Sequence, residues 1–280
     1  MIHIDQASPG TAPLADAPVV DAHAHAFTLD MPLSPTAWHA PPAAAPIEQY
    51  LAALDANGVT FGVLAGATLF GTYNDYAIEA CRRHRRLRTT VILEPDTSQR
   101  EMRAMAADGV IGVRLQWRHV REVPDLKSGA YRVFLRRIAD LGWQVHLHDD
   151  SDRLPPYLDA LEAAGVTVVV EHFGRPNPDT GGTACPGFQR VLRSVETGRT
   201  WVKLASAFRL ASAQLARDAA AELLRHAGPE RLVWGSDWPF AAFESSIGYR
   251  QTLDTLQDLV PDPAARRRIT CETPLKLFFA

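Results

Sequence analysis

Cysteine is scarce in this chain, and its few cysteines form no recognisable pattern. The sequence contains three, Cys81, Cys185 and Cys271, which lie far apart and include no CxxC pair. An odd number of isolated cysteines does not fit a disulfide-stabilised scaffold and is typical of reduced thiols. Residues 1–18 also lack the basic start and apolar stretch of a secretory signal. The sequence therefore predicts a cytoplasmic location.

The chain has neither a surplus of positive charge nor a long hydrophobic run. Its 29 Lys and Arg residues stand against 32 Asp and Glu residues, which gives a net charge of −3 at pH 7. A basic footprint for nucleic acid or for an anionic membrane surface is therefore missing. No apolar stretch approaches the roughly 18 residues that a membrane-spanning helix needs. We expect a soluble protein that binds neither nucleic acid nor membranes.

Eight short apolar runs, rich in Val, Ile and Leu, recur along the chain, as strands buried on both faces should. They are residues 18–25, 58–67, 87–95, 109–117, 142–150, 165–173, 200–208 and 231–240. Between them lie segments whose apolar residues are three and four apart. Four of these segments, 46–58, 97–109, 131–142 and 153–165, end at a glycine, as helices often do. The alternation predicts parallel βαβ units.

Eight such units in 280 residues predict a closed (β/α)8 barrel, the TIM-barrel architecture, in a single domain. We place the barrel at residues 19–280, an N-terminal extension at 1–18, and an insertion at the Pro- and Ala-rich residues 32–46. A doubly wound open sheet is the alternative. That fold normally carries a glycine-rich phosphate loop after its first strand, and "DAHAHAF" is not such a loop.

Polar and ionisable residues gather where the apolar runs end. In (β/α)8 enzymes the active site forms at the C-terminal ends of the strands. His23 and His25 end the first strand, and because they are two residues apart they point to the same face. The other candidates are Thr68 and Thr72 after the second strand, Arg114, Arg118 and Arg121 at the fourth, His148 at the fifth, His172 at the sixth, Arg209 after the seventh and Asp237 after the eighth. We expect these side chains to meet in one active site.

Several of these residues also have a simpler interpretation. Asp237 could be a helix N-cap, and Arg114 could pair with a neighbouring carboxylate. Glu171 precedes His172, and by strand alternation it should face the helices, so we interpret it as structural. His146 and His148 share a face, but His148 lies nearer to the strand end and is the better candidate.

Three motifs occur together in this chain: "VVDAHAHAF" (19–27), "VVVEHFGRP" (168–176) and "LVWGSDWP" (232–239). With them the chain resembles the amidohydrolase superfamily. More narrowly, it is similar to the branch that contains 2-pyrone-4,6-dicarboxylate lactonases and related sugar-acid and sulfomuconolactone lactonases. The resemblance covers residues 19–279. It implies a hydrolase that opens the ester bond of a carboxylated lactone, in the catabolism of aromatic compounds or sugar acids.

The resemblance also implies a role for each candidate. It makes Asp237 the general base that deprotonates the hydrolytic water. It makes His23, His25 and His172 the groups that polarise the lactone carbonyl and hold the oxyanion. The residues that it implies for substrate binding are Arg209, Arg114, Thr68, Thr72, His148 and one of Arg118 and Arg121.

Whether a metal takes part is a separate question. Much of the superfamily binds a divalent metal at these positions, whereas the pyrone-dicarboxylate lactonases work without one and often carry Tyr where this chain has His148. Three imidazoles and a carboxylate would suit Zn²⁺, which lowers the pKa of its bound water to ~7. We favour no metal, since Asp237 can deprotonate water itself. The alternative is one Zn²⁺ or another divalent ion held by His23, His25, His148 and Asp237.

The leading hypothesis is hydrolysis of a lactone that bears one or two carboxylates. The arginines favour an anionic substrate, because a guanidinium matches a carboxylate bidentately. The alternatives are a Zn-dependent decarboxylase of the same superfamily, a lactone isomerase in which a substrate hydroxyl replaces water, and a non-catalytic barrel that binds an anionic metabolite.

Overall fold

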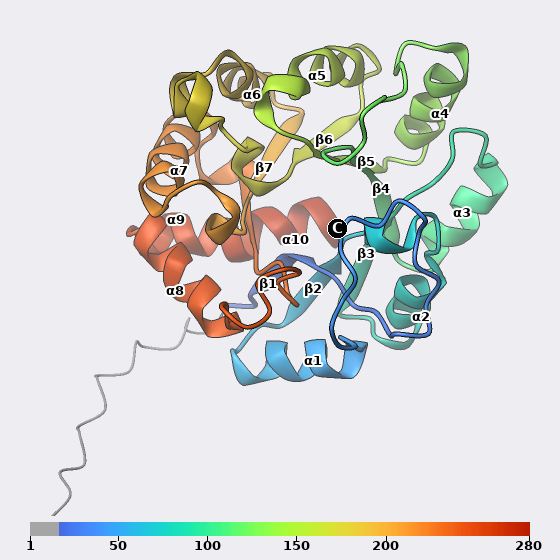
Figure 1. Ribbon diagram of the computed structural model, residues 1–280, viewed down its shortest axis with the longest axis horizontal. Coiled ribbons are helices and arrows are strands. Elements are labelled where there is room, and N and C mark those ends of the chain that lie inside the picture. The colour runs from blue at the N-terminus through green and yellow to red at the C-terminus, as the bar shows by residue number, and fades with distance from the viewer. Residues whose placement is uncertain (1–16) are drawn as a thin grey trace, which may run out of the picture.

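The computed structural model of this chain describes residues 17–280 and contains one barrel of eight parallel strands, which neighbour one another in sequence order (Figure 1). The strands are β1 (Val20–Ala24), β2 (Phe61–Leu64), β3 (Leu87–Val91), β4 (Val110–Gln116), β5 (Gln144–His148), β6 (Thr167–Val170), β7 (Thr200–Ala205) and β8 (Leu232–Gly235). The predicted (β/α)8 barrel is thus confirmed. The predicted extension at 1–18 falls almost entirely outside the described residues, so that domain boundary stays a prediction.

The barrel is closed by the residues that follow β8 rather than by β8 alone. The backbone N–H of Asp237 donates to the carbonyl of His23 at 2.7 Å, and the N–H of His25 donates to the carbonyl of Trp238 at 2.7 Å. A bridge between Ala24 and Trp238 completes the junction. Closure therefore ties the backbone of Asp237 to that of His23, and the backbone of Trp238 to that of His25.

Helices surround the strands and cover their outer faces (Figure 1). They are α1 (Ile47–Ala56), α2 (Asp75–Arg83), α3 (Gln99–Ala107), α4 (Gly129–Asp140), α5 (Leu154–Ala163), α6 (Pro186–Glu196), α7 (Ala213–Ala227), α8 (Tyr249–Leu259), α9 (Pro263–Arg267) and α10 (Thr273–Phe278). The four predicted helices correspond to α1, α3, α4 and α5. Local sequence explains several starts: Ser98 and Glu101 form a capping box at α3, and Ser212 caps α7.

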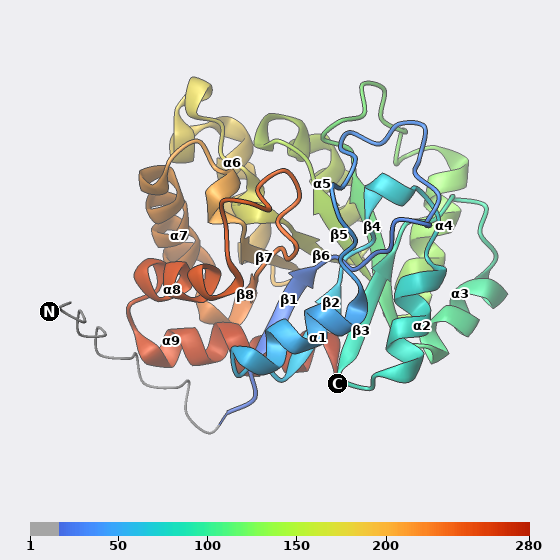
Figure 2. The same cartoon turned by 60° about the horizontal axis from the view of Figure 1, so that its bottom comes forward.

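The two ends of the barrel differ. Phe278 of α10 packs with Val20, Val63 and Val233, so one end of the barrel interior is filled by apolar side chains. Figure 2 shows the long connections after β1 and β8 at the other end, opposite the C-terminus. The connection after β1 contains the predicted insertion, and Phe27 pairs with Ala45 across its base. The ionisable candidates lie at this second end.

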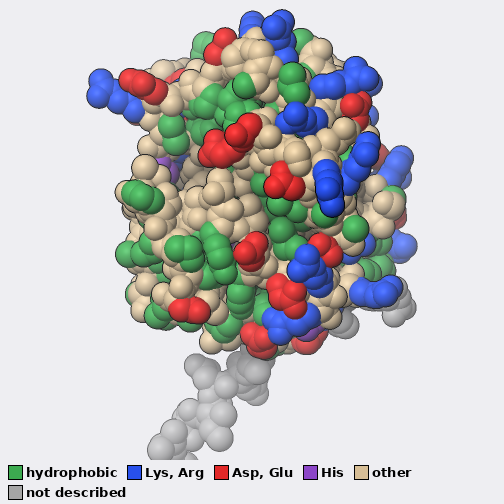
Figure 3. Space-filling view, turned by 90° about the vertical axis from the view of Figure 1, so that its right-hand side faces the viewer, with side chains coloured by type: hydrophobic (Ala, Val, Ile, Leu, Met, Phe, Trp, Pro, Cys, Tyr) green, Lys and Arg blue, Asp and Glu red, His purple; other side chains and the backbone are tan. Residues whose placement is uncertain are grey.

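The described residues also show the state of the cysteines, the character of the helices and the distribution of surface charge. Cys81, Cys185 and Cys271 are buried free thiols. Among residues 17–280, no helix combines the length and the apolar character that crossing a membrane requires. On the face shown in Figure 3, Lys and Arg side chains are interspersed with Asp and Glu rather than gathered in one basic patch.

Candidate active site

A cavity of about 270 Å³ opens at the C-terminal ends of the strands. Its lining includes His25, Thr68, Arg114, Arg118, His148, His172, Arg175, Arg209 and Asp237. A second hollow of about 280 Å³ lies outside the barrel between α7 and α8, and apolar side chains such as Leu204, Trp234 and Leu256 contribute most of its wall. Because the first cavity collects the ionisable groups, we take it as the candidate active site.

Asp237 lies against both histidines of the HxH pair. Its Oδ1 is 3.4 Å from Nε2 of His23 and 3.5 Å from Nε2 of His25. The ring of His172 stands edge-on to the ring of His23, with their centroids 4.9 Å apart. The structure therefore brings together four predicted residues from β1 and from the segments that follow β6 and β8.

The direction in which His23 and His25 point depends on a local irregularity of β1. The pairing of β1 with β2 shifts register between Asp21 and Ala24, and such a bulge re-aims the side chains beside it. The carboxylate of Asp21 accepts hydrogen bonds from the backbone N–H of His23 at 3.1 Å and of Ser236 at 2.8 Å. Asp21 thus fastens β1 to the end of β8.

The segments that follow β6, β7 and β8 share an unusual backbone conformation. His172, Ser206 and Asp237 have positive φ angles of 50°, 61° and 65°. Non-glycine residues adopt this left-handed region at a cost, and such residues cluster at functional sites. The turns after β6, β7 and β8 are therefore held in a strained conformation that sets the direction of their side chains.

The carboxylate of Asp237 stays ionised although it is buried. Burial alone would raise its pKa, but the charge of Arg209 outweighs this effect and holds the pKa well below its usual value. Nε of Arg209 donates to Oδ2 of Asp237 at 2.6 Å. Oδ1, which faces the histidines, is the oxygen left for a water molecule.

Two neighbouring histidines present a lone pair at Nε2. Nδ1 of His25 lies 2.8 Å from the carbonyl of Ala65, and Nδ1 of His172 lies 3.4 Å from the carbonyl of Ala205. A carbonyl only accepts, so each Nδ1 carries the proton when the ring is neutral. Burial lowers the pKa of His25 to about 4 and the pKa of His172 well below its ordinary value, so both rings are neutral at pH 7.

Glu171 faces the interior of the barrel, and our prediction that it faces the helices is wrong. Its carboxylate accepts from Nη2 of Arg114 at 2.7 Å and lies 3.4 Å from Nζ of Lys203. Strand β6 ends at Val170, and the left-handed turn at His172 follows, so strand alternation does not extend to Glu171. Burial would raise its pKa, yet Arg114, His23 and Lys203 hold the pKa well below normal.

Lys203 is a member of this cluster that we did not select from the sequence. It is fully buried in β7, and its Nζ lies 3.0 Å from Nδ1 of His23. Burial lowers the pKa of Lys203 to about 8, so the amine still carries its proton at pH 7. The signal was present: a lysine inside the apolar run 200–208 needs a buried partner.

The arginines divide into two kinds. Arg114 lines the cavity, but it also pairs with a carboxylate, which is the simpler interpretation given above. It donates to Glu171 and to the carbonyl of Gly66, the latter at 2.8 Å. Arg118 and Arg175 both donate to Oδ1 of Asp150, at 3.1 Å and 2.7 Å, and both line the cavity. Arg175, which follows the "EHFG" motif, is a second residue that we did not select.

The structure also places the remaining candidates, including Arg118 and Arg121, between which the sequence left the choice open. Arg118 reaches the cavity, whereas Arg121 is exposed and is not part of its lining. Thr68 lines the cavity, whereas the exposed Thr72 lines a different hollow, beside Glu94. His148 lines it as well, and its neighbour on the same strand, His146, is buried below with Nε2 3.1 Å from the Gln144 amide oxygen.

The donor set fits a divalent cation. Ligand atoms of His23, His25 and Asp237 all lie within 4.8 Å of one another. The lone pair of His25 and Oδ1 of Asp237 face each other, and Nε2 of His23 is buried without a hydrogen-bond partner among the described residues. His148, the fourth ligand in our metal alternative, is not part of this group. The chemistry of the donors and the family membership shown below support the metal alternative over our expectation of none.

The fold and the site define a (β/α)8 enzyme with a histidine-flanked carboxylate at the barrel mouth. Comparison with known proteins identifies the family: an amidohydrolase family model matches residues 20–280. The chain belongs to the amidohydrolase family. Its resemblance to the pyrone-dicarboxylate lactonase branch is confirmed as well.

Three similar proteins carry hydrolase names. The chain is 27% identical to 4-sulfomuconolactone hydrolase from Hydrogenophaga intermedia, over 92% of this chain and 88% of the relative. Two similar solved structures are described as a probable and a putative 2-pyrone-4,6-dicarboxylic acid hydrolase. The one from Pseudomonas putida has 34% identity and a TM-score of 0.87, over 94% of this chain and 98% of that chain. The one from Acinetobacter baumannii, with citric acid bound, has 29% identity and a TM-score of 0.88, over 93% and 98%.

Proposed function

We propose that this protein hydrolyses a lactone that carries one or two carboxylates. The observation that supports it most directly is the ionised Asp237, which has one oxygen facing His23 and His25 and the other held by Arg209. A general base needs an ionised carboxylate within reach of a water molecule. The arginines around the same cavity match an anionic substrate.

Asp237 acts as the general base in this proposal, and the histidines act on the carbonyl. Water that donates to Oδ1 of Asp237 loses its proton as it attacks the lactone carbon. His23, His25 and His172 surround the carbonyl oxygen, whose charge grows in the transition state. Without a cation the donor to this oxygen is His23, because Nδ1 carries the proton in the neutral rings of His25 and His172. One properly placed donor at such an oxyanion contributes a factor of ~10²–10³. The ring then opens, and Asp237 returns the proton to the leaving oxygen.

Arg209 couples substrate binding to the strength of the base. It holds Asp237 in the free protein and lowers the pKa of that carboxyl, which makes Asp237 a weak base. A substrate carboxylate that binds Arg209 takes over part of this contact, and the pKa of Asp237 then rises towards the range in which a base is effective. Arg118 or Arg175 would bind a second carboxylate, and Thr68 and His148 contact the ring.

We extend the proposal to one divalent cation, Zn²⁺ or another, as cofactor. His23, His25 and Asp237 would hold it, and it would supply Lewis-acid polarisation of the carbonyl and a bound water of lowered pKa. No observation favours the decarboxylase, the isomerase or the non-catalytic alternative over hydrolysis.

A panel of carboxylated lactones, assayed by proton release with and without added zinc, tests the proposal. We expect one proton per lactone opened, for at least one member of the panel. Ligand-induced thermal stabilisation without proton release would instead show a binding protein. Metal analysis of the protein, purified without chelator, accompanies the assay.

A further inference from the structure

The guanidinium of Arg209 is held by aromatic side chains as well as by Asp237. Its Cζ lies over the ring of Phe208, 5.1 Å from the centroid, and over the ring of Phe243, 5.3 Å from the centroid. These two rings stand edge to face, with their centroids 5.1 Å apart. A cation is attracted to the face of an aromatic ring, and the attraction is larger where water is excluded. Arg209 meets this condition, since its side chain is only 15% exposed.

The two rings come from different parts of the chain. Phe208 directly precedes Arg209 in the turn Ala207–Arg209 after β7, so it moves together with the arginine. Phe243 lies in the connection after β8 and lines the cavity together with Arg209. Of the two rings, Phe243 is therefore the one that can fix Arg209 relative to the end of β8, where Asp237 lies.

The connection after β8 is itself held on both sides of Phe243. Phe240 and Ala242 have positive φ angles of 67° and 66°, which persist only where the surroundings hold them. The backbone N–H of Phe243 donates to the carbonyl of Phe240 at 2.6 Å. Oε1 of the next residue, Glu244, lies 2.9 Å from Nε2 of His39 in the insertion after β1. The insertion, which has no part in the reaction described above, thus anchors the loop that carries Phe243.

We propose that Phe243 is a positioning residue that holds the guanidinium of Arg209 ready for the substrate carboxylate. This inference rests on the proposed function, in which Arg209 binds that carboxylate. Nε of Arg209 is used by Asp237, and among residues 17–280 the guanidinium makes no further hydrogen bond, which leaves its Nη groups to the substrate. A long side chain that is ordered before binding loses less conformational freedom when the ligand arrives, so the affinity is higher.

Binding of benzene-1,3-dicarboxylate, a dicarboxylate without a lactone bond, tests this role by isothermal titration calorimetry. Phe243→Leu keeps an apolar side chain but removes the ring face, so the affinity should fall about fivefold. Phe243→Tyr keeps the ring face, and its affinity should stay within about twofold of the wild-type value. When Arg209→Met is already present, Phe243→Leu should cause no further loss, because the ring acts through the arginine.

A second measurement needs neither ligand nor turnover. NMR spectra of ¹⁵N-arginine-labelled protein report the exchange of the Nε–H proton of Arg209 with water, and its signal is identified by its loss in Arg209→Met. We expect this exchange to be about fivefold faster in Phe243→Leu than in the wild-type protein, and unchanged in Phe243→Tyr. Phe279→Leu is the matched control, because Cζ of Arg88 lies over the ring of Phe279 at 4.7 Å, outside the cavity. It should change neither value.

Two results would overturn the inference. One is a folded Phe243→Leu variant with wild-type affinity and wild-type Nε–H exchange. The other is an equal loss of affinity with and without Arg209→Met, which would mean that Phe243 contacts the ligand itself. If Phe243→Leu does not fold, Phe243→Met provides the same comparison. If the wild-type protein opens no lactone, the proposed function fails, while the Nε–H exchange and the affinity for the dicarboxylate still decide on Phe243.

Discussion

At the scale of the residue, the site depends on how a few charges are shared. Asp237 is ionised because Arg209 outweighs the cost of burial, and Glu171 is ionised because Arg114 and Lys203 do the same one layer deeper. Each buried carboxylate is thus matched by cations, as buried charge requires. The rings of His25 and His172 stay neutral, and each turns its Nδ1 to a backbone carbonyl.

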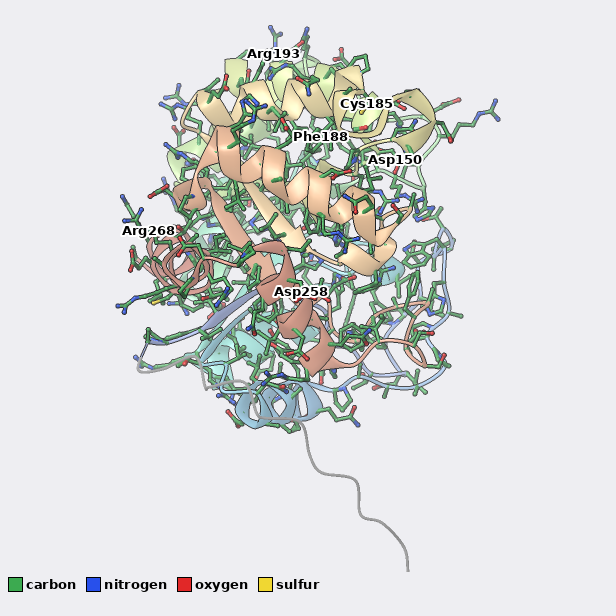
Figure 4. All side chains as sticks on the ribbon, turned by 90° about the vertical axis from the view of Figure 1, so that its left-hand side faces the viewer. Asp150, Cys185, Phe188, Arg193, Asp258 and Arg268 are labelled. Carbon is green, nitrogen blue, oxygen red and sulfur yellow. The ribbon has the colours of Figure 1, made fainter. Side chains whose placement is uncertain are left out.

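Replacing the proposed base tests the first of these residues. Asp237→Asn keeps the shape of the side chain but cannot accept a proton, so we expect kcat to fall by ~10³-fold or more. Thermal unfolding and circular dichroism should show an intact fold. Asp258→Asn is the matched control, because Asp258 is exposed on α8 at the outer face of the molecule (Figure 4). Near-normal turnover in Asp237→Asn would remove the assignment of the base.

Arg209 should act chiefly on substrate binding. Arg209→Met removes the guanidinium that holds Asp237 and would bind the substrate carboxylate, so KM should rise about 10- to 100-fold, with a smaller change in kcat. Steady-state kinetics on a carboxylated lactone measure both values. The exposed Arg193 on α6 provides the control Arg193→Met (Figure 4). Unchanged KM and kcat in Arg209→Met would exclude the proposed role.

At the scale of the element, strand ends rather than strand bodies determine the site. The strands could be predicted because buried parallel strands are apolar runs, and ionisable residues gather near the ends of most of these runs. The side on which Glu171 lies could not be predicted, because it depends on the left-handed turn at His172 and not on alternation. Lys203 was overlooked for a related reason: its importance lies in a contact with His23, 180 residues away along the chain.

The junction between β8 and β1 gives a prediction at this scale. A Cβ added at Gly235 would lie 2.5 Å from Cβ and 2.7 Å from the backbone nitrogen of His23. Gly235→Ala should therefore push the strands apart, lower the unfolding free energy by about 1–3 kcal/mol and reduce activity together with it. Gly129→Ala is the control, since nothing lies within 4 Å of its added Cβ. Denaturant unfolding and turnover of both variants would show whether the close contact matters; equal behaviour would contradict it.

At the scale of the whole molecule, the buried histidines make stability depend on pH. Burial lowers the pKa of His25 to about 4 and the pKa of His146, His148 and His172 well below normal. In the unfolded chain these groups titrate near ~6.5. As pH falls from about 6.5 towards 4, the unfolded state therefore takes up protons that the folded state does not, and the free energy of unfolding falls.

Urea unfolding at pH 7 and at pH 5 measures this effect. His25 alone should account for a loss of about 2 kcal/mol between the two values. The midpoint of unfolding should therefore lie at a clearly lower urea concentration at pH 5. A midpoint that is unchanged or higher at pH 5 would mean that the histidines are not buried as neutral rings.

In the proposed reaction water is the nucleophile and a lactone ring is opened. Hydrolysis of a carboxylated lactone in ¹⁸O-water, with the product analysed by mass spectrometry, tests this claim most directly. The account predicts one ¹⁸O atom in the new carboxylate of each product molecule and no release of CO₂. A rearranged lactone without label, or CO₂ as product, would contradict it.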